Sequence, residues 1–147
     1  MQVPLKSVPI FADLNDSALA FIRNLFQKSV VAPGTVIVEE GEPGSRFYLV
    51  CEGKVRVCKN HGRPYQVILA TLGPGSFFGE MCVLETLPRS ATVESVDEVT
   101  LWSLSPADFY SFYEAKPDQY CLLVVAIARA LSQRLRRLND LFASAVQ

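Results

Sequence analysis

A regular succession of short apolar runs between about Ser29 and Leu104 constrains the fold of this chain more than any other feature. The runs are rich in Val, Ile and Thr, and they cover residues 30–31, 35–38, 47–50, 55–58, 66–69, 91–93 and 99–102. Turn residues separate them, as at residues 41–44 and 73–75. Short β-prone segments at this spacing predict a β-sandwich or barrel. Helical periodicity interrupts them only around residues 80–87, so a parallel sheet with crossover helices is not expected.

Helical patterns flank the strand-rich stretch on both sides. Before it, Asn15 or Asp16 can cap a short helix, and apolar residues then recur at helical spacing, at Leu19, Ile22, Leu25 and Phe26. After it, residues 105–108 supply an N-cap hydroxyl, a proline at the first helical position and an acid at the third. This helix is expected to end near Lys116, and Pro117 to begin a longer one. The patterns divide a single domain of residues 1–147 into a helical segment (1–28), a β-roll (29–104) and C-terminal helices (105–147).

The last helix carries a heptad pattern. Its apolar positions are spaced four, three, four, three and four residues apart, at Val124, Ala128, Leu131, Leu135, Leu138 and Phe142. A helix that only packs on the sandwich needs one apolar stripe, whereas this helix is long and carries further apolar residues, Leu122, Leu123, Ile127 and Leu141. The pattern favours a homodimer seam, and purely intramolecular packing is the alternative.

Composition and charge exclude several classes of function. The formal net charge of −1 argues against a protein that binds nucleic acid by neutralising phosphates. The chain has no uncharged apolar run of ~18 residues or more and no signal-peptide pattern at its start, so we expect no contact with a membrane and a cytoplasmic location. His61 is the only histidine, and the four cysteines have neither a CxxC pair nor metal-ligand spacing. No metal, cofactor or hydrolase triad is therefore expected.

The segment from Gly75 to Ser90 departs from a generic sandwich. Gly79 followed by Glu80 and a helical turn suits an anion, because N–H groups at a helix start point outward and glycine allows close approach. Arg89 follows nine residues after Glu80, and a guanidinium can bind two phosphate oxygens at once. Phosphate would repel Glu80, so we assign it to a ribose hydroxyl. The combination describes a nucleotide site; the alternative is a structural ion pair between Glu80 and Arg89.

The string from Phe78 to Val93 closely resembles the phosphate-binding cassette of cyclic nucleotide-binding domains. That family includes the catabolite activator proteins, the regulatory subunits of cAMP-dependent protein kinase and cyclic nucleotide-gated channels. Residues 48–55 look like its strand-turn-strand signature and residues 73–80 like its approach to the cassette. The resemblance implies a mainly β fold with flanking helices: an antiparallel β jelly-roll (double-stranded β-helix) sandwich with a short N-terminal helix, a short cassette helix and C-terminal helices.

Carried over by position, the resemblance implies a role for each cassette residue. Glu80 would bind the ribose 2′-hydroxyl and Arg89 the cyclic phosphate of cAMP or cGMP. Gly79 and Cys82, the latter in place of the family's usual alanine, would contribute backbone N–H groups. The Ser90 hydroxyl would contact the phosphate or the purine. Met81 and Ala91 complete the predicted ligand-binding residues of the cassette.

The family's last helix covers the purine, either in the same subunit or from its neighbour. Counted from Pro117, residues around Arg134, Leu135 and Leu138 would reach the base. The Arg134 guanidinium could stack on it, and a solvated flank of the coiled coil is the alternative for that residue.

We therefore predict a non-catalytic sensor domain for signal transduction, in which the ligand repositions the last helix against an unknown protein partner. A part of a cyclic-nucleotide-responsive transcription regulator is the alternative, since bacterial family members carry a helix-turn-helix after the long helix. This chain stops at Gln147 without one, so direct binding to nucleic acid is not expected. A haem or iron–sulfur sensor on the same fold, or a cupin-like metalloenzyme, would need more histidines or better-spaced cysteines.

Overall fold

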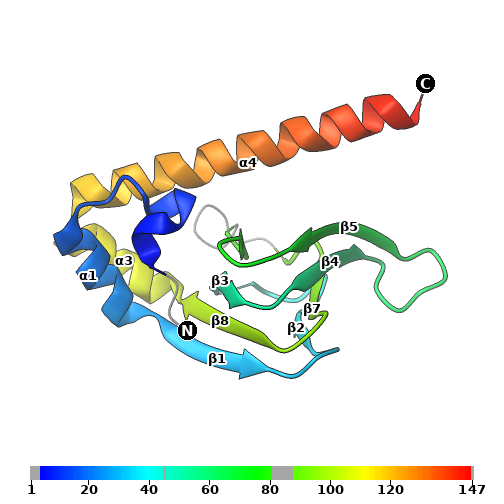
Figure 1. Cartoon of the computed structure of the whole chain (residues 1–147), viewed down its shortest axis with the longest axis horizontal. Helices are drawn as coiled ribbons and strands as arrows, with labels where there is room; N and C mark the ends of the chain where they lie inside the picture. Colours follow the sequence, from blue (N-terminus) through cyan, green and yellow to red (C-terminus); the bar gives the residue numbers. More distant parts are fainter. Residues whose placement is uncertain (1–3, 45, 81–87, 147) are drawn as a thin grey trace.

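Two four-stranded antiparallel sheets form a sandwich with helices at one end (Figure 1). The computed structural model describes residues 4–44, 46–80 and 88–146. The first sheet has the order β1 (Gln27–Val31), β8 (Val99–Leu104), β3 (Phe47–Glu52) and β6 (Phe77–Phe78). The second has the order β2 (Val36–Val38), β7 (Thr92–Ser95), β4 (Val55–Lys59) and β5 (Val67–Leu72). The mainly β, antiparallel jelly-roll prediction is confirmed.

The central strands β3 and β8 of the first sheet are buried on both faces, and their side chains alternate between two cores, whereas the edge strand β1 is exposed. On one face Phe47, Leu49 and Cys51 of β3 join Trp102 and Leu104 of β8 in a core shared with the helices. On the other face, alternate residues point into the space between the sheets, where Val50, Phe78, Val99 and Leu101 meet Val38, Val55 and Val93. Because β8 is covered on both faces, all six of its residues are buried, including the polar Thr100 and Ser103.

The helices begin where the sequence predicts. Helix α1 (Asp16–Leu25) is capped by the Asn15 side chain, which accepts a hydrogen bond from the Ala18 N–H at 2.8 Å. Helix α3 (Pro106–Ala115) begins with a reciprocal capping box between Ser105 and Asp108. Two 3₁₀ turns, η1 (Leu5–Ser7) and η2 (Pro9–Phe11), precede α1 and were not predicted. The predicted cassette helix falls on residues 81–87, outside the described residues.

Helix α4 (Pro117–Ala145) has fully buried apolar side chains only along its first half. It starts beside α1 and α3 and then runs past β5 (Figure 1). Leu123 and Ile127 are buried in the helical core, whereas Leu135, Leu138, Leu141 and Phe142 are each more than half exposed. Of the heptad positions, Leu131 packs partly against that core. None of the described helices is long and apolar enough to cross a membrane.

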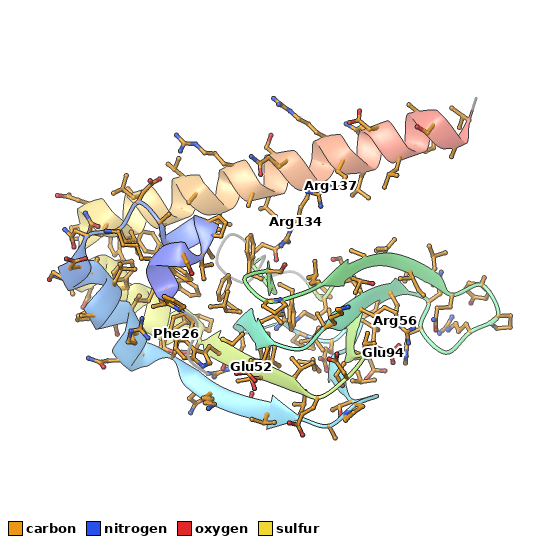
Figure 2. The ribbon with its side chains drawn as sticks, viewed as in Figure 1. Phe26, Glu52, Arg56, Glu94, Arg134 and Arg137 are labelled. Carbon is orange, nitrogen blue, oxygen red and sulfur yellow. The ribbon has the colours of Figure 1, made fainter. Side chains whose placement is uncertain are left out.

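A buried carboxylate ties the strands of the second sheet together (Figure 2). Glu94 on β7 accepts hydrogen bonds from the Arg56 guanidinium on β4 and lies 2.8 Å from Nε2 of His61 in the β4–β5 turn. The Arg56 hydrogen bond, followed by the one from His61, lowers the pKa of Glu94. These contacts hold β4 and β7, which form one wall of the cavity described next.

Candidate functional site

A cavity of about 290 Å³ is lined by α4, the second sheet and the segments on either side of residues 81–87. Six predicted ligand-binding residues line it: Gly79, Glu80, Arg89, Ser90, Ala91 and Arg134. They come from the end of β6, from the approach to β7 and from α4, so the fold brings distant parts of the chain to one place. The other two, Met81 and Cys82, lie outside the described residues.

The backbone of Arg89 is fixed by the loop that connects β2 and β3. The Arg89 N–H donates to the Glu42 carbonyl and the Gly41 N–H donates to the Arg89 carbonyl, each at 2.8 Å. An isolated β-bridge between Pro43 and Pro88 extends this pairing. The anion-binding residue predicted from the sequence therefore sits on a hydrogen-bonded frame.

The Arg89 side chain lies in a space left by two glycines. A Cβ atom at Gly44 would stand 2.6 Å from Nε of Arg89, and one at Gly79 would stand 2.7 Å from its Nη1. Nη2 donates to the Arg46 carbonyl at 3.0 Å. Glycine at both positions thus lets the guanidinium lie between the two backbone segments.

The Nε–H of this guanidinium is left unpaired among the described residues. The Arg89 Nε atom is buried and has no hydrogen-bond acceptor in the part of the chain that the structure describes, and no carboxylate there forms an ion pair with Arg89. A buried charged donor without an acceptor is costly, and an anion entering the cavity would supply the acceptor. The alternative of a structural ion pair between Glu80 and Arg89 is wrong, because Glu80 has a different partner.

That partner is Arg134 of α4. Its Nη1 atom lies 3.9 Å from Oε1 of Glu80, whose side chain is 13% exposed. Its Nη2 atom donates to the Phe77 carbonyl at 2.7 Å, and its guanidinium lies over the Phe77 ring, 4.2 Å from the centroid. The solvated-flank alternative for Arg134 is therefore wrong. Burial lowers the pKa of Arg134, the Glu80 charge opposes that shift, and Arg137 adds to it.

Strand β6 places Glu80 at the cavity. Its two residues stack on β3, Phe77 on Phe47 with ring centroids 5.6 Å apart and Phe78 on Tyr48 with 4.9 Å. Gly79 then turns the chain with a φ of +78°, a conformation that favours glycine. The strand was missed from the sequence because two residues are too few for a β pattern.

The remaining wall is apolar and was largely missed. It contains Val57, Leu69, Ala70 and Leu72 from β4 and β5, together with Leu138 and Leu141 from α4, and Arg137 of α4 adds a charged side chain to the lining. Of the helix residues predicted to reach the base, Arg134 and Leu138 line the cavity, but Leu135 does not. Two later residues of α4, Arg137 and Leu141, also line the cavity (Figure 2 shows Arg134 and Arg137 on the side of the helix that faces the sheets). Strand β5, apolar at consecutive positions, was the signal for this wall.

The described residues contain no group of three or more His, Cys, Asp or Glu side chains placed to hold a metal ion.

The side chains that line the cavity include several polar groups. They are the carboxylate of Glu80, the guanidinium groups of Arg89, Arg134 and Arg137, and the hydroxyl and backbone of Ser90. Together with the apolar wall, this set matches a small ligand that carries a negative charge, a hydroxyl donor and an apolar ring.

Comparisons with known proteins point to the same ligand class. The family model described as "Cyclic nucleotide-binding domain" matches residues 28–116. A cyclic nucleotide-gated potassium channel from Mesorhizobium japonicum is 39% identical over 112 residues, which cover 76% of this chain and 30% of the channel. The cyclic AMP receptor protein of Thermus thermophilus is 33% identical over 132 residues, which cover 90% of this chain and 59% of the receptor. The chain thus spans less than two thirds of either relative.

A solved structure supports the fold. The crystal structure of a cyclic nucleotide-binding domain from Methylobacillus flagellatus superposes with a TM-score of 0.85, covering 94% of this chain and 81% of that one at 20% sequence identity. At that identity the likeness concerns the sandwich and its helices.

Proposed function

The chain belongs to the cyclic nucleotide-binding domain family, and from that premise we propose that it is a non-catalytic cytoplasmic sensor domain for cAMP or cGMP. The observation that carries the proposal is the Arg89 guanidinium, whose buried Nε has no acceptor among the described residues, in a cavity that Glu80 also lines. A cyclic phosphate carries one negative charge and two exocyclic oxygens, which a guanidinium can bind together.

In this arrangement each part of the ligand meets a different wall. The phosphate lies against Arg89 and the Ser90–Ala91 backbone, and Met81 and Cys82 are predicted to add to this end. The ribose 2′-hydroxyl donates to Glu80. The purine lies along Ala70, Leu72 and Leu138, where burial of apolar surface stabilises it.

Ligand binding and the position of α4 are coupled through Glu80. The Glu80 carboxylate attracts Arg134, so a ribose hydroxyl that approaches it shares or replaces that contact. Arg134 is then free to rearrange against the base, and α4 with it. A surface on α4 can transmit occupancy to a protein partner in this way.

We also propose a homodimer through α4. Four of the predicted seam residues, Ala128, Leu135, Leu138 and Phe142, are exposed. A row of exposed leucine and phenylalanine side chains along one face of a helix has an unfavourable free energy in water unless another surface covers it. The alternative is that the domain belongs to a cyclic-nucleotide-responsive transcription regulator, and the length of the native reading frame tests it.

The test is displacement of a fluorescent cyclic nucleotide by unlabelled compounds. We expect cAMP or cGMP to displace it at much lower concentration than 5′-AMP or adenosine. The open phosphate of 5′-AMP does not fit the same frame between Glu80 and Arg89, and adenosine offers nothing to Arg89. Equal displacement by adenosine would contradict the proposal, and the order of cAMP and cGMP gives the base preference.

A further inference from the structure

A lysine outside the cavity binds the backbone of residues 89–91, which we call the anion-binding segment. Nζ of Lys59, the last residue of β4, donates to the Ser90 carbonyl at 2.5 Å. Lys59 does not line the cavity, whereas Ser90 and Ala91 both do. The lysine therefore contacts these residues from outside the cavity.

The geometry of the peptide bond gives this contact a consequence inside the cavity. A trans peptide unit is planar, and its C=O and N–H groups point in opposite directions. The unit between Ser90 and Ala91 has its C=O directed at the Lys59 ammonium, so its N–H is directed away from Lys59. A positive charge on the carbonyl also polarises the unit and makes the Ala91 N–H a stronger donor.

Lys59 is itself held in place by Glu40. Oε2 of Glu40 lies 3.3 Å from Nζ of Lys59, and Oε1 accepts the Asn60 N–H at 3.0 Å. The Glu40 N–H donates to Oγ1 of Thr92 at 2.9 Å, which ties the same residue to the start of β7. The Asn60 N–H and then the Lys59 ammonium lower the pKa of Glu40, so the carboxylate stays charged. The two side chains form a bridge from β4 to the anion-binding segment.

We propose that Lys59 is a positioning residue for the cyclic phosphate: by binding the Ser90 carbonyl it aims the Ala91 N–H at an exocyclic oxygen of the ligand. The inference rests on the proposed function. It adds a residue on a different strand, outside the cassette and the cavity, to those that determine affinity.

The test compares three variants by isothermal titration with the cyclic nucleotide that the wild type binds. Lys59→Met keeps the aliphatic stem and removes the charge, and we expect it to weaken binding about three- to tenfold, as for the loss of one hydrogen bond. Lys59→Arg keeps a cationic donor and should bind like the wild type. Lys54→Met, at an exposed lysine before β4 that does not line the cavity, is the matched control and should also bind like the wild type.

The phosphorothioate diastereomers of the ligand separate positioning from a general loss of structure. Each places sulfur, a weaker acceptor, at one of the two exocyclic positions, and only one of these faces the Ala91 N–H. We expect unequal affinities in the wild type and a ratio closer to one in Lys59→Met. Unchanged affinity in Lys59→Met, or weaker binding with the same ratio, would overturn the inference and leave the proposed function standing. A wild type that binds neither cAMP nor cGMP would overturn both.

Discussion

The place of the Arg89 guanidinium depends on residues that have no side chain. Gly44 and Gly79 lie on either side of it, and a Cβ atom at either position would press against the guanidinium group. Gly79 carries a second constraint, because its Cβ would also clash with the Arg46 carbonyl oxygen, which accepts a hydrogen bond from Arg89. The glycine that precedes Glu80 thus shapes the site as well as the turn.

This assignment predicts different costs for two glycine substitutions with the same backbone strain. Gly34 and Gly79 have φ values of +76° and +78°, but only Gly79 has neighbours within reach of a new Cβ. Gly34→Ala should lower the free energy of unfolding by about 1–2 kcal/mol, the cost of a left-handed residue. Gly79→Ala should cost about 1–3 kcal/mol more, because the Arg46 backbone must shift. Urea denaturation measures both, and equal losses would refute the steric role.

The sequence predicted which residues form the site better than it predicted which side chains they contact. Glu80 and Arg89 were found from their spacing and residue types, and both line the cavity. The ion pair of Glu80 with Arg134 could not be predicted from the sequence. It joins the residues that follow β6 to a helix more than fifty positions later, and only the fold determines that the two side chains lie close together. The same holds for Arg46, which contributes a carbonyl that any residue type would supply.

Helix α4 has two roles along its length. Its first half supplies Leu123 and Ile127 to the helical core, and its second half supplies Arg134, Leu138 and Leu141 to the cavity. The heptad pattern was read as one continuous seam, but the structure divides it, because Leu131 packs partly on the core. A periodic apolar pattern does not say which of several surfaces covers it, and that is why the alternatives stayed open.

Substitutions at two residues of α4 that belong neither to the core nor to the cavity lining test the proposed homodimer. Leu135 and Phe142 are 59% and 71% exposed, lie on the heptad pattern and do not line the cavity. Replacing both with aspartate places charges in the proposed seam, so we expect the molar mass in light scattering to fall from about twice 16.3 kDa to 16.3 kDa. Val125→Asp, at an exposed position off the pattern, should leave the mass unchanged. A wild type that is already monomeric would contradict the seam.

For the whole molecule, the order of elements followed from the sequence but the layer arrangement did not. Turn residues and β-prone runs located seven of the eight strands, and capping residues located α1 and α3. The pairing of β1 with β8 and of β2 with β7 joins segments about sixty or more residues apart, and local patterns carry no information about such partners. That pairing brings the β2–β3 loop against Arg89 and makes the cavity.

We propose that this cavity binds a cyclic nucleotide through Arg89. Isothermal titration of the wild type and two variants tests this proposal. We predict binding of cAMP or cGMP with one ligand per chain. Arg89→Ala should weaken it by tenfold to more than a hundredfold, since a charge-assisted hydrogen bond contributes about 1.5–3 kcal/mol. Arg63→Ala, an exposed arginine that does not line the cavity, should bind like the wild type. No heat with either nucleotide at high protein concentration, or unchanged affinity in Arg89→Ala, would contradict the claim.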